Sequence, residues 1–224
     1  MFDLKIRKQQ FLNLIERYEN DVIDFLLKNT NRLILIRGVK FIGKTTMIYK
    51  IFNQINNIPI IYHTGCDPTK RKIANNYFEK KLNEYKDKEC LVILDEFYYA
   101  DNCEYFNKHK NFKVLLFVNT YNLSIPGFKH FNLMDVYEQY KREFFKEENI
   151  NFKNKNIREI IYLFDHQNFV EEDYNVTQNY FESLRTQSNQ TQTKIKENGI
   201  LTVETITFSK KIIVSLDRLN VTQK

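Results

Sequence analysis

The fold is decided by a nine-residue stretch, GVKFIGKTT, which runs from Gly38 to Thr46. It matches the whole pattern G-x-x-x-x-G-K-[ST], in which main-chain N–H groups surround the phosphates of a nucleotide. The apolar run Leu33–Ile36 precedes it and a helical pattern over Met47–Ile55 follows it, which is the strand–loop–helix context that such a loop requires. The stretch therefore predicts a phosphate-binding loop with a nucleoside triphosphate as its ligand.

The side chains at the end of the loop have expected roles of their own. We expect the Lys44 ammonium group to reach the β and γ oxygens and to take part in hydrolysis, and the Thr45 hydroxyl to bind Mg²⁺. The positive end of the following helix adds to the attraction for phosphate. The residues predicted to bind the nucleotide are Gly38, Val39, Lys40, Phe41, Ile42, Gly43, Lys44, Thr45 and Thr46.

Polar residues end two further apolar runs. Cys90–Leu94 is followed by Asp95 and Glu96, and Val114–Val118 is followed by Asn119. Ligands of open parallel sheets gather at the carboxyl ends of the strands. We expect Asp95 to bind Mg²⁺, Glu96 to polarise the attacking water, and Asn119 to sense the γ-phosphate or orient that water. Two solvated acids at a strand end, and an asparagine that only forms a turn, are the alternatives.

Apolar runs separated by helical segments predict an α/β fold, in which helices cover both faces of a parallel sheet. The run Ile58–Tyr62 lies between the loop strand and the acidic strand, and Phe131–Met134 is expected to be a short fifth strand. This order, with a glutamate after the aspartate, is typical of the additional-strand, catalytic-glutamate branch of P-loop proteins. Helices are expected over Phe11–Leu27 and Lys70–Lys88.

The composition indicates a protein of the cytoplasm without a membrane segment. The 224 residues are 42% hydrophobic, contain no run near the roughly 18 apolar residues of a membrane span, and begin without the apolar region of a signal peptide. The 3 cysteines match no zinc or redox spacing, and the 4 histidines are dispersed. The net charge of +6 permits weak attraction to nucleic acid.

The character of the chain changes near residue 150. We expect a nucleotide-binding domain over residues 1–150 and a small C-terminal domain over residues 157–224, with a polar linker between them. Three helices followed by a hairpin outline a winged helix, in which Ser188–Asn198 is the recognition helix and Lys210 and Lys211 form the wing tip. This domain is expected to contact DNA, although a polar solvated surface or a protein contact fits the same residues.

The sequence resembles the AAA-like ATPases of bacteria, archaea and their viruses, the archaeal-type group that is close to the STAND NTPases. The resemblance covers about residues 5–148 and is carried by RLILIRGVKFIGKTTMIYKIF, IIYHT, CLVILDEFYYADN, KVLLFVNT and FNLMDVYEQYKREFF. It implies ATP and Mg²⁺ as the cofactors and a conformational switch driven by the nucleotide, and relatives often carry a C-terminal winged helix.

The sequence departs from the family pattern in its arginines. Relatives commonly have an arginine inside the loop and a Gly-Arg pair before the last core strand, whereas this chain has Lys40 and the stretch Gly127–Lys129. Arg142 is the nearest candidate for an arginine that contacts phosphate, although a solvated helix arginine is the simpler reading. Hydrolysis is therefore expected either to be slow or to depend on a partner protein or a second copy of the chain that supplies the missing charge.

Three functions fit this sequence. The first is an ATP-hydrolysing switch or motor that acts on DNA or a nucleoprotein. The second is a viral genome-packaging ATPase, which requires a ring and an arginine from a neighbouring subunit. The third is a regulator that binds ATP, hydrolyses little of it and binds DNA or protein. The pair Asp95 and Glu96 favours hydrolysis, and the missing arginine favours the regulator.

Overall fold

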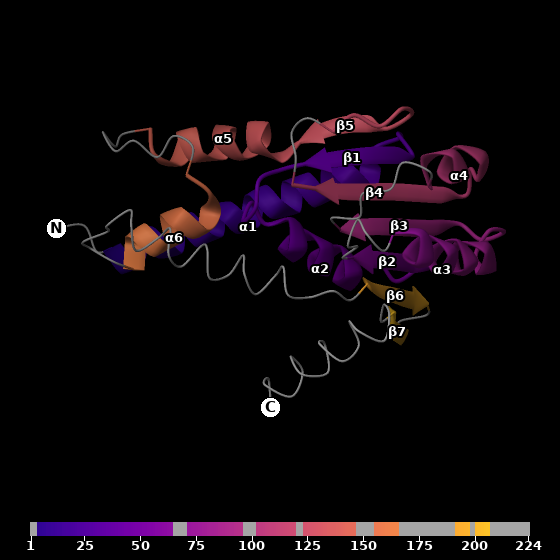
Figure 1. Cartoon of the computed structure of the whole chain (residues 1–224). Coiled ribbons are helices and arrows are strands. Elements are labelled where there is room, and N and C mark those ends of the chain that lie inside the picture. Colours follow the sequence, from indigo (N-terminus) through magenta and orange to yellow (C-terminus); the bar gives the residue numbers. More distant parts are fainter. Residues whose placement is uncertain are drawn as a thin grey trace.

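A mixed sheet of seven strands, in the order β5-β1-β4-β3-β2-β6-β7, forms the centre of the structure. The computed structural model describes residues 4–64, 71–95, 102–119, 123–146, 155–165, 191–197 and 200–206. Figure 1 shows the strands stacked from β5 at the top to β7 at the bottom, with helices around them. The α/β fold that the sequence predicts is confirmed.

The strands are β1 (Leu33–Arg37), β2 (Ile60–Thr64), β3 (Cys90–Asp95), β4 (Phe112–Val118), β5 (Lys129–Asn132), β6 (Thr191–Glu197) and β7 (Ile200–Ile206). The helices are α1 (Leu4–Lys28), α2 (Lys44–Gln54), α3 (Arg71–Glu84), α4 (Asn102–Lys108), α5 (Leu133–Phe144) and α6 (Ile157–Asp165). None of the described helices combines the length and the apolar character that a membrane span requires.

Five strands run parallel and bring their carboxyl ends to one edge of the sheet. β1 pairs with β5 and β4, and β3 pairs with β4 and β2. β4 therefore separates the strand that precedes the loop from the strand that ends in Asp95. The strands are continuous apolar runs because both faces of the sheet are covered.

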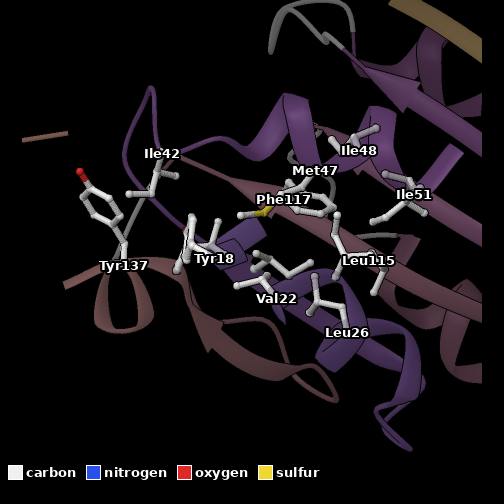
Figure 2. Close-up of a cluster of buried hydrophobic side chains, with 14 of the residues drawn as sticks. Tyr18, Val22, Leu26, Ile42, Met47, Ile48, Ile51, Leu115, Phe117 and Tyr137 are labelled. Carbon is white, nitrogen blue, oxygen red and sulfur yellow. The ribbon is translucent and has the colours of Figure 1, made fainter. Parts of the chain in front are cut away.

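Each face of the sheet has its own core. Alternate strand residues such as Ile36 and Phe117 pack against α1, α2, α5 and α6, whereas neighbours such as Leu35 and Leu116 pack against α3 and α4. Figure 2 shows part of the first core, where Val22 and Leu26 of α1 lie beside Leu115 of β4. Ile42 of the loop belongs to the first core, so the loop is packed against the helices on that face of the sheet.

Helix α1 is one continuous helix whose buried positions recur at intervals of three and four residues, as a helix with one apolar face requires. These positions are Phe11, Ile15, Tyr18, Val22, Ile23 and Leu26. Its apolar face is shared by α5 and α6: the Phe11 ring lies 5.4 Å from that of Phe144 and 5.7 Å from that of Phe164.

Helix α6 begins with a capping box. The Asn156 side chain accepts a hydrogen bond from the main-chain N–H of Glu159 at 3.0 Å, and the Glu159 carboxylate accepts one from the N–H of Asn156. Ile157 and Ile160 are buried in the core that α1 helps to form, and Lys8 of α1 pairs with Asp165 at 2.6 Å. The described part of the C-terminal segment therefore packs on the nucleotide-binding part of the chain.

The prediction of a recognition helix over Ser188–Asn198 is wrong for residues 191–197, the part of this stretch that the structure describes. Residues 191–197 form strand β6, which pairs antiparallel with β2, and β7 pairs antiparallel with β6. Thr191, Thr193 and Ile195 are β-branched and favour extended backbone, and the edge of β2 offers them main-chain partners. Residues 166–190 and 207–224, with Lys210 and Lys211 of the expected wing, lie outside the described residues.

A substitution in α6 tests whether this helix is part of the same folding unit. Ile160 is fully buried, so I160A is expected to lower the free energy of unfolding by about 2–4 kcal/mol, which is the usual loss for such a truncation. Thermal denaturation followed by circular dichroism measures it. I6A is the control, since Ile6 is 57% exposed. Two transitions, of which I160A moves only the smaller, would show α6 in a separate domain.

Candidate functional site

The predicted phosphate-binding loop connects β1 to α2, as expected. Its first residue, Gly38, donates a main-chain hydrogen bond to the carbonyl of Val118 at 3.1 Å, which ties the loop to β4. A Cβ at Gly38 would lie 2.8 Å from Cγ2 of Ile42 and 3.0 Å from Cδ1 of Leu133, so only glycine fits there. Gly43 has a φ of +90°, a left-handed conformation that side chains disfavour.

The Lys44 side chain is folded back over the start of the loop. It is buried, with 5% exposure, and its Nζ donates to the carbonyl oxygens of Gly38 and Val39, both at 2.8 Å. These contacts place a positive charge above the loop, at the position where the sequence predicts contact with β and γ oxygens.

The amino end of α2 lies at the end of the loop, because the helix begins at Lys44. Gly43 is its N-cap and has no side chain with which to accept hydrogen bonds from the first turn, which contains no acidic residue. The first-turn N–H groups of an α-helix have no partner within the helix, and they carry the positive end of its dipole. The main-chain N–H groups of Lys44, Thr45 and Thr46 lie at this end of α2, and helix ends of this kind commonly bind anions.

Asp95 lies at the carboxyl end of β3, on the edge of the sheet where the loop begins. Its carboxylate is buried, with 6% exposure, and accepts a hydrogen bond from the Tyr62 hydroxyl at 3.2 Å. Burial, followed by the charge of Asp95, raises the pKa of Tyr62, so this phenol stays a proton donor. Thr64 donates to the main-chain oxygen of Asp95 at 3.1 Å. The neighbouring strand therefore orients the carboxylate.

Asn119 follows β4 directly, between the strand of the loop and the strand of Asp95. The strand register pairs Val118 with Arg37 and Phe117 with Asp95, so Asn119 lies one residue beyond the end of the pairing with β1 and two residues beyond the end of the pairing with β3. Its Oδ1 is buried and has no hydrogen-bond partner among the described residues. A buried acceptor of this kind is expected to have a ligand or water as its partner. Glu96 lies outside the described residues.

The residues available for Mg²⁺ fit that ion. Thr45 offers a hydroxyl and Asp95 a carboxylate, which are hard oxygen ligands, and Mg²⁺ in nucleotide sites takes its other ligands from water and phosphate. The described residues contain no group of three or more His, Cys, Asp or Glu side chains that could hold a metal by themselves.

Two charged residues that the sequence analysis did not single out lie against the loop. The Arg158 guanidinium of α6 lies 4.2 Å from the centre of the Phe41 ring, and Glu19 of α1 lies beside Gly43. Arg142, our candidate arginine, bonds the Glu138 carbonyl of its own helix at 3.2 Å through Nε. The capping box predicts where α6 begins, but no local pattern indicates which part of the sheet this helix meets.

The comparisons with known proteins agree with this geometry. A search of curated proteins found no match. The sequence model of a family described as an AAA domain matches residues 30–198, a span that includes the loop, Asp95, Asn119 and α6. Because the match covers more than half of the 224 residues, the chain belongs to this AAA-domain family, within the AAA-like P-loop ATPases.

Proposed function

We propose that this chain binds Mg·ATP in the loop Gly38–Thr46, hydrolyses it, and uses the cycle as a switch or motor. The observation that carries this proposal is the strand order β1-β4-β3, because it brings the loop, Asn119 and Asp95 to one edge of the sheet. Phosphoryl transfer needs mainly positioning and charge neutralisation, which these residues supply together.

The role of each residue follows from its chemistry. Lys44 neutralises the β and γ oxygens, and the N–H groups at the start of α2 hold the phosphates. Thr45 and Asp95 would hold Mg²⁺, which supplies Lewis-acid stabilisation of the developing charge when it is bound. Glu96 accepts a proton from the attacking water, and Asn119 fixes the γ-phosphate or that water through its amide.

The partner that we propose is DNA or a nucleoprotein. The net charge of +6 gives this partner weak support, because it favours binding to a polyanion without specifying one. The expected DNA-contacting helix gives none, because strand β6 forms over the described part of that stretch. A genome-packaging ATPase remains the alternative for a chain that forms rings, and an ATP-bound regulator remains the alternative for one that barely turns over.

The deciding experiment measures three properties of the purified full chain. Calorimetry with Mg·ATP and Mg·GTP tests binding, and absence of heat with both overturns the proposed function. ATP hydrolysis with and without double-stranded DNA at a stated low salt concentration tests the partner. Light scattering tests the ring. DNA-stimulated turnover in a ring favours packaging, and bound ATP with little turnover favours the regulator.

The Arg158 guanidinium lies against Phe41 of the loop, so removal of this side chain is expected to slow hydrolysis. Arg158 contacts Phe41, whose φ of +64° is unusual for a residue other than glycine. We expect R158A to lower the turnover rate about tenfold, a smaller loss than a fully engaged arginine gives because Arg158 is exposed. R142A is measured alongside it, because Arg142 is the arginine that the sequence analysis singled out. Equal rates for R158A and wild type would remove Arg158 from the reaction.

A further inference from the structure

Glu19 of helix α1 is a buried acid in contact with the phosphate-binding loop. Although glutamate is a charged residue, Glu19 is only 5% exposed and lies on the side of α1 that carries the buried apolar residues. A Cβ built on Gly43 would lie 2.8 Å from Oε1 of Glu19, so the carboxylate occupies the space in which a side chain at this glycine would lie. The loop glycine and the acid of α1 are therefore packed directly against each other.

The second oxygen of the same carboxylate binds helix α2. Oε2 of Glu19 lies 3.0 Å from Nζ of Lys50, and this ammonium group also donates to Oδ1 of Asn20 at 3.3 Å. Burial raises the pKa of Glu19, and the hydrogen bond and charge of Lys50 oppose this effect. One carboxylate thus spans α2 from its N-cap to its second turn.

The same turn of α1 is fixed to α5 on its other side. Arg17 pairs with Glu143 at 3.0 Å, and Asp21 accepts a hydrogen bond from the Tyr140 hydroxyl. Helix α5 in turn places Leu133 against the other loop glycine, Gly38. Helix α1 therefore packs against Gly43 and helix α5 against Gly38. Helix α1 is also bonded to both α2 and α5.

We propose that Glu19 is a positioning residue for the phosphate-binding loop, and that α1 is a working part of the nucleotide site; this inference rests on the proposed function. The family match begins at residue 30, after the end of α1 at Lys28, so family membership does not imply it. The contacts described above for the Glu19 carboxylate are with the loop and with α2. It acts through Gly43 and Lys50.

The physical reason is preorganisation. Phosphates are held by main-chain N–H groups, whose directions depend on the conformation of Gly43 and on the position of the first turn of α2. Loss of the Glu19 side chain opens space beside a glycine that already has wide conformational freedom, and it removes the carboxylate that fixes Lys50. A bound nucleotide must then order the loop, and the affinity falls accordingly.

The test compares three variants of the full chain by calorimetry with Mg·ATP, at a temperature well below their unfolding transitions. We expect E19A to weaken binding about tenfold and E19Q about threefold, since glutamine keeps the shape but loses the charge. D24A is the matched control, because Asp24 is on the same helix in an exposed ion pair with Lys28. It is expected to bind like wild type.

A double-mutant cycle separates positioning from mere stability. If the pair acts as a unit, E19Q combined with K50Q weakens binding no more than E19Q alone, whereas losses that multiply contradict a joint action. Wild-type affinity in folded E19A and E19Q, even with lower unfolding temperatures, overturns the inference. If E19A does not fold, E19Q and the cycle decide. Absence of binding by the wild type overturns the proposed function instead.

Discussion

Replacement of Lys44 by alanine is expected to abolish measurable binding of Mg·ATP. Lys44 is the buried ammonium group that the structure holds over the loop through the carbonyls of Gly38 and Val39. Charge-assisted hydrogen bonds to phosphate are about twice as strong as neutral ones, and the lysine of such a loop is expected to contact two phosphate groups. We expect a loss of at least about a hundredfold in affinity, which is about 2.7 kcal/mol.

Calorimetry on folded protein measures this loss, and circular dichroism shows that the variant has kept its structure. K28A is a suitable control, because Lys28 is an exposed residue at the far end of α1. Binding of Mg·ATP by K44A with the affinity of the wild type would mean that the nucleotide lies elsewhere in the chain.

The sequence predicts the loop and the central sheet well because both depend on local signals. Leu33–Ile36 and Cys90–Leu94 are unbroken apolar runs, and a parallel strand buried on both faces must have such a run. The glycines of the loop mark positions where the structure has no room for a side chain or needs a positive φ, namely Gly38 and Gly43. Asp95 could be predicted as a site residue because it directly follows one of these apolar runs, at the end of β3.

The parts that sequence reasoning missed depend on contacts between distant residues. Residues 191–197 are polar except for Ile195, and the pattern alone does not distinguish a solvated helix from a strand that joins an open sheet edge. Lys196 is held by the Phe52 carbonyl, by the Ile55 carbonyl at 3.1 Å and by Oδ1 of Asn56 at 2.8 Å, all at the carboxyl end of α2. No local propensity reports such contacts.

The same limit applies to the charges around the loop. Glu19 precedes Gly43 by 24 residues and Arg158 follows it by 115, and neither belongs to a motif with a known spacing to the loop. An acid in the interface of an amphipathic helix is the one signal that was present, because Glu19 follows Tyr18 on the buried side of α1. Buried acids are rare unless they are paired, so such a residue indicates a contact but not its partner.

Replacement of Glu96 by glutamine is expected to leave Mg·ATP bound and to stop hydrolysis. Glu96 follows Asp95, the last residue of β3, and the expected role of its carboxylate is to take a proton from the attacking water. General bases contribute about 10²–10⁴-fold to rate, so we expect the single-turnover rate to fall by at least about a hundredfold. Glutamine keeps the size of the side chain, so the affinity for Mg·ATP should change little.

The control for this substitution is E89Q, because Glu89 is exposed and lies just before the opposite end of the same strand. D95N provides the contrast: it removes a proposed ligand of Mg²⁺, so its defect should lessen as the Mg²⁺ concentration is raised, whereas that of E96Q should not. Hydrolysis by E96Q at the rate of the wild type would exclude Glu96 as the base. Asn119, whose buried Oδ1 has no partner among the described residues, would then be the next residue to replace.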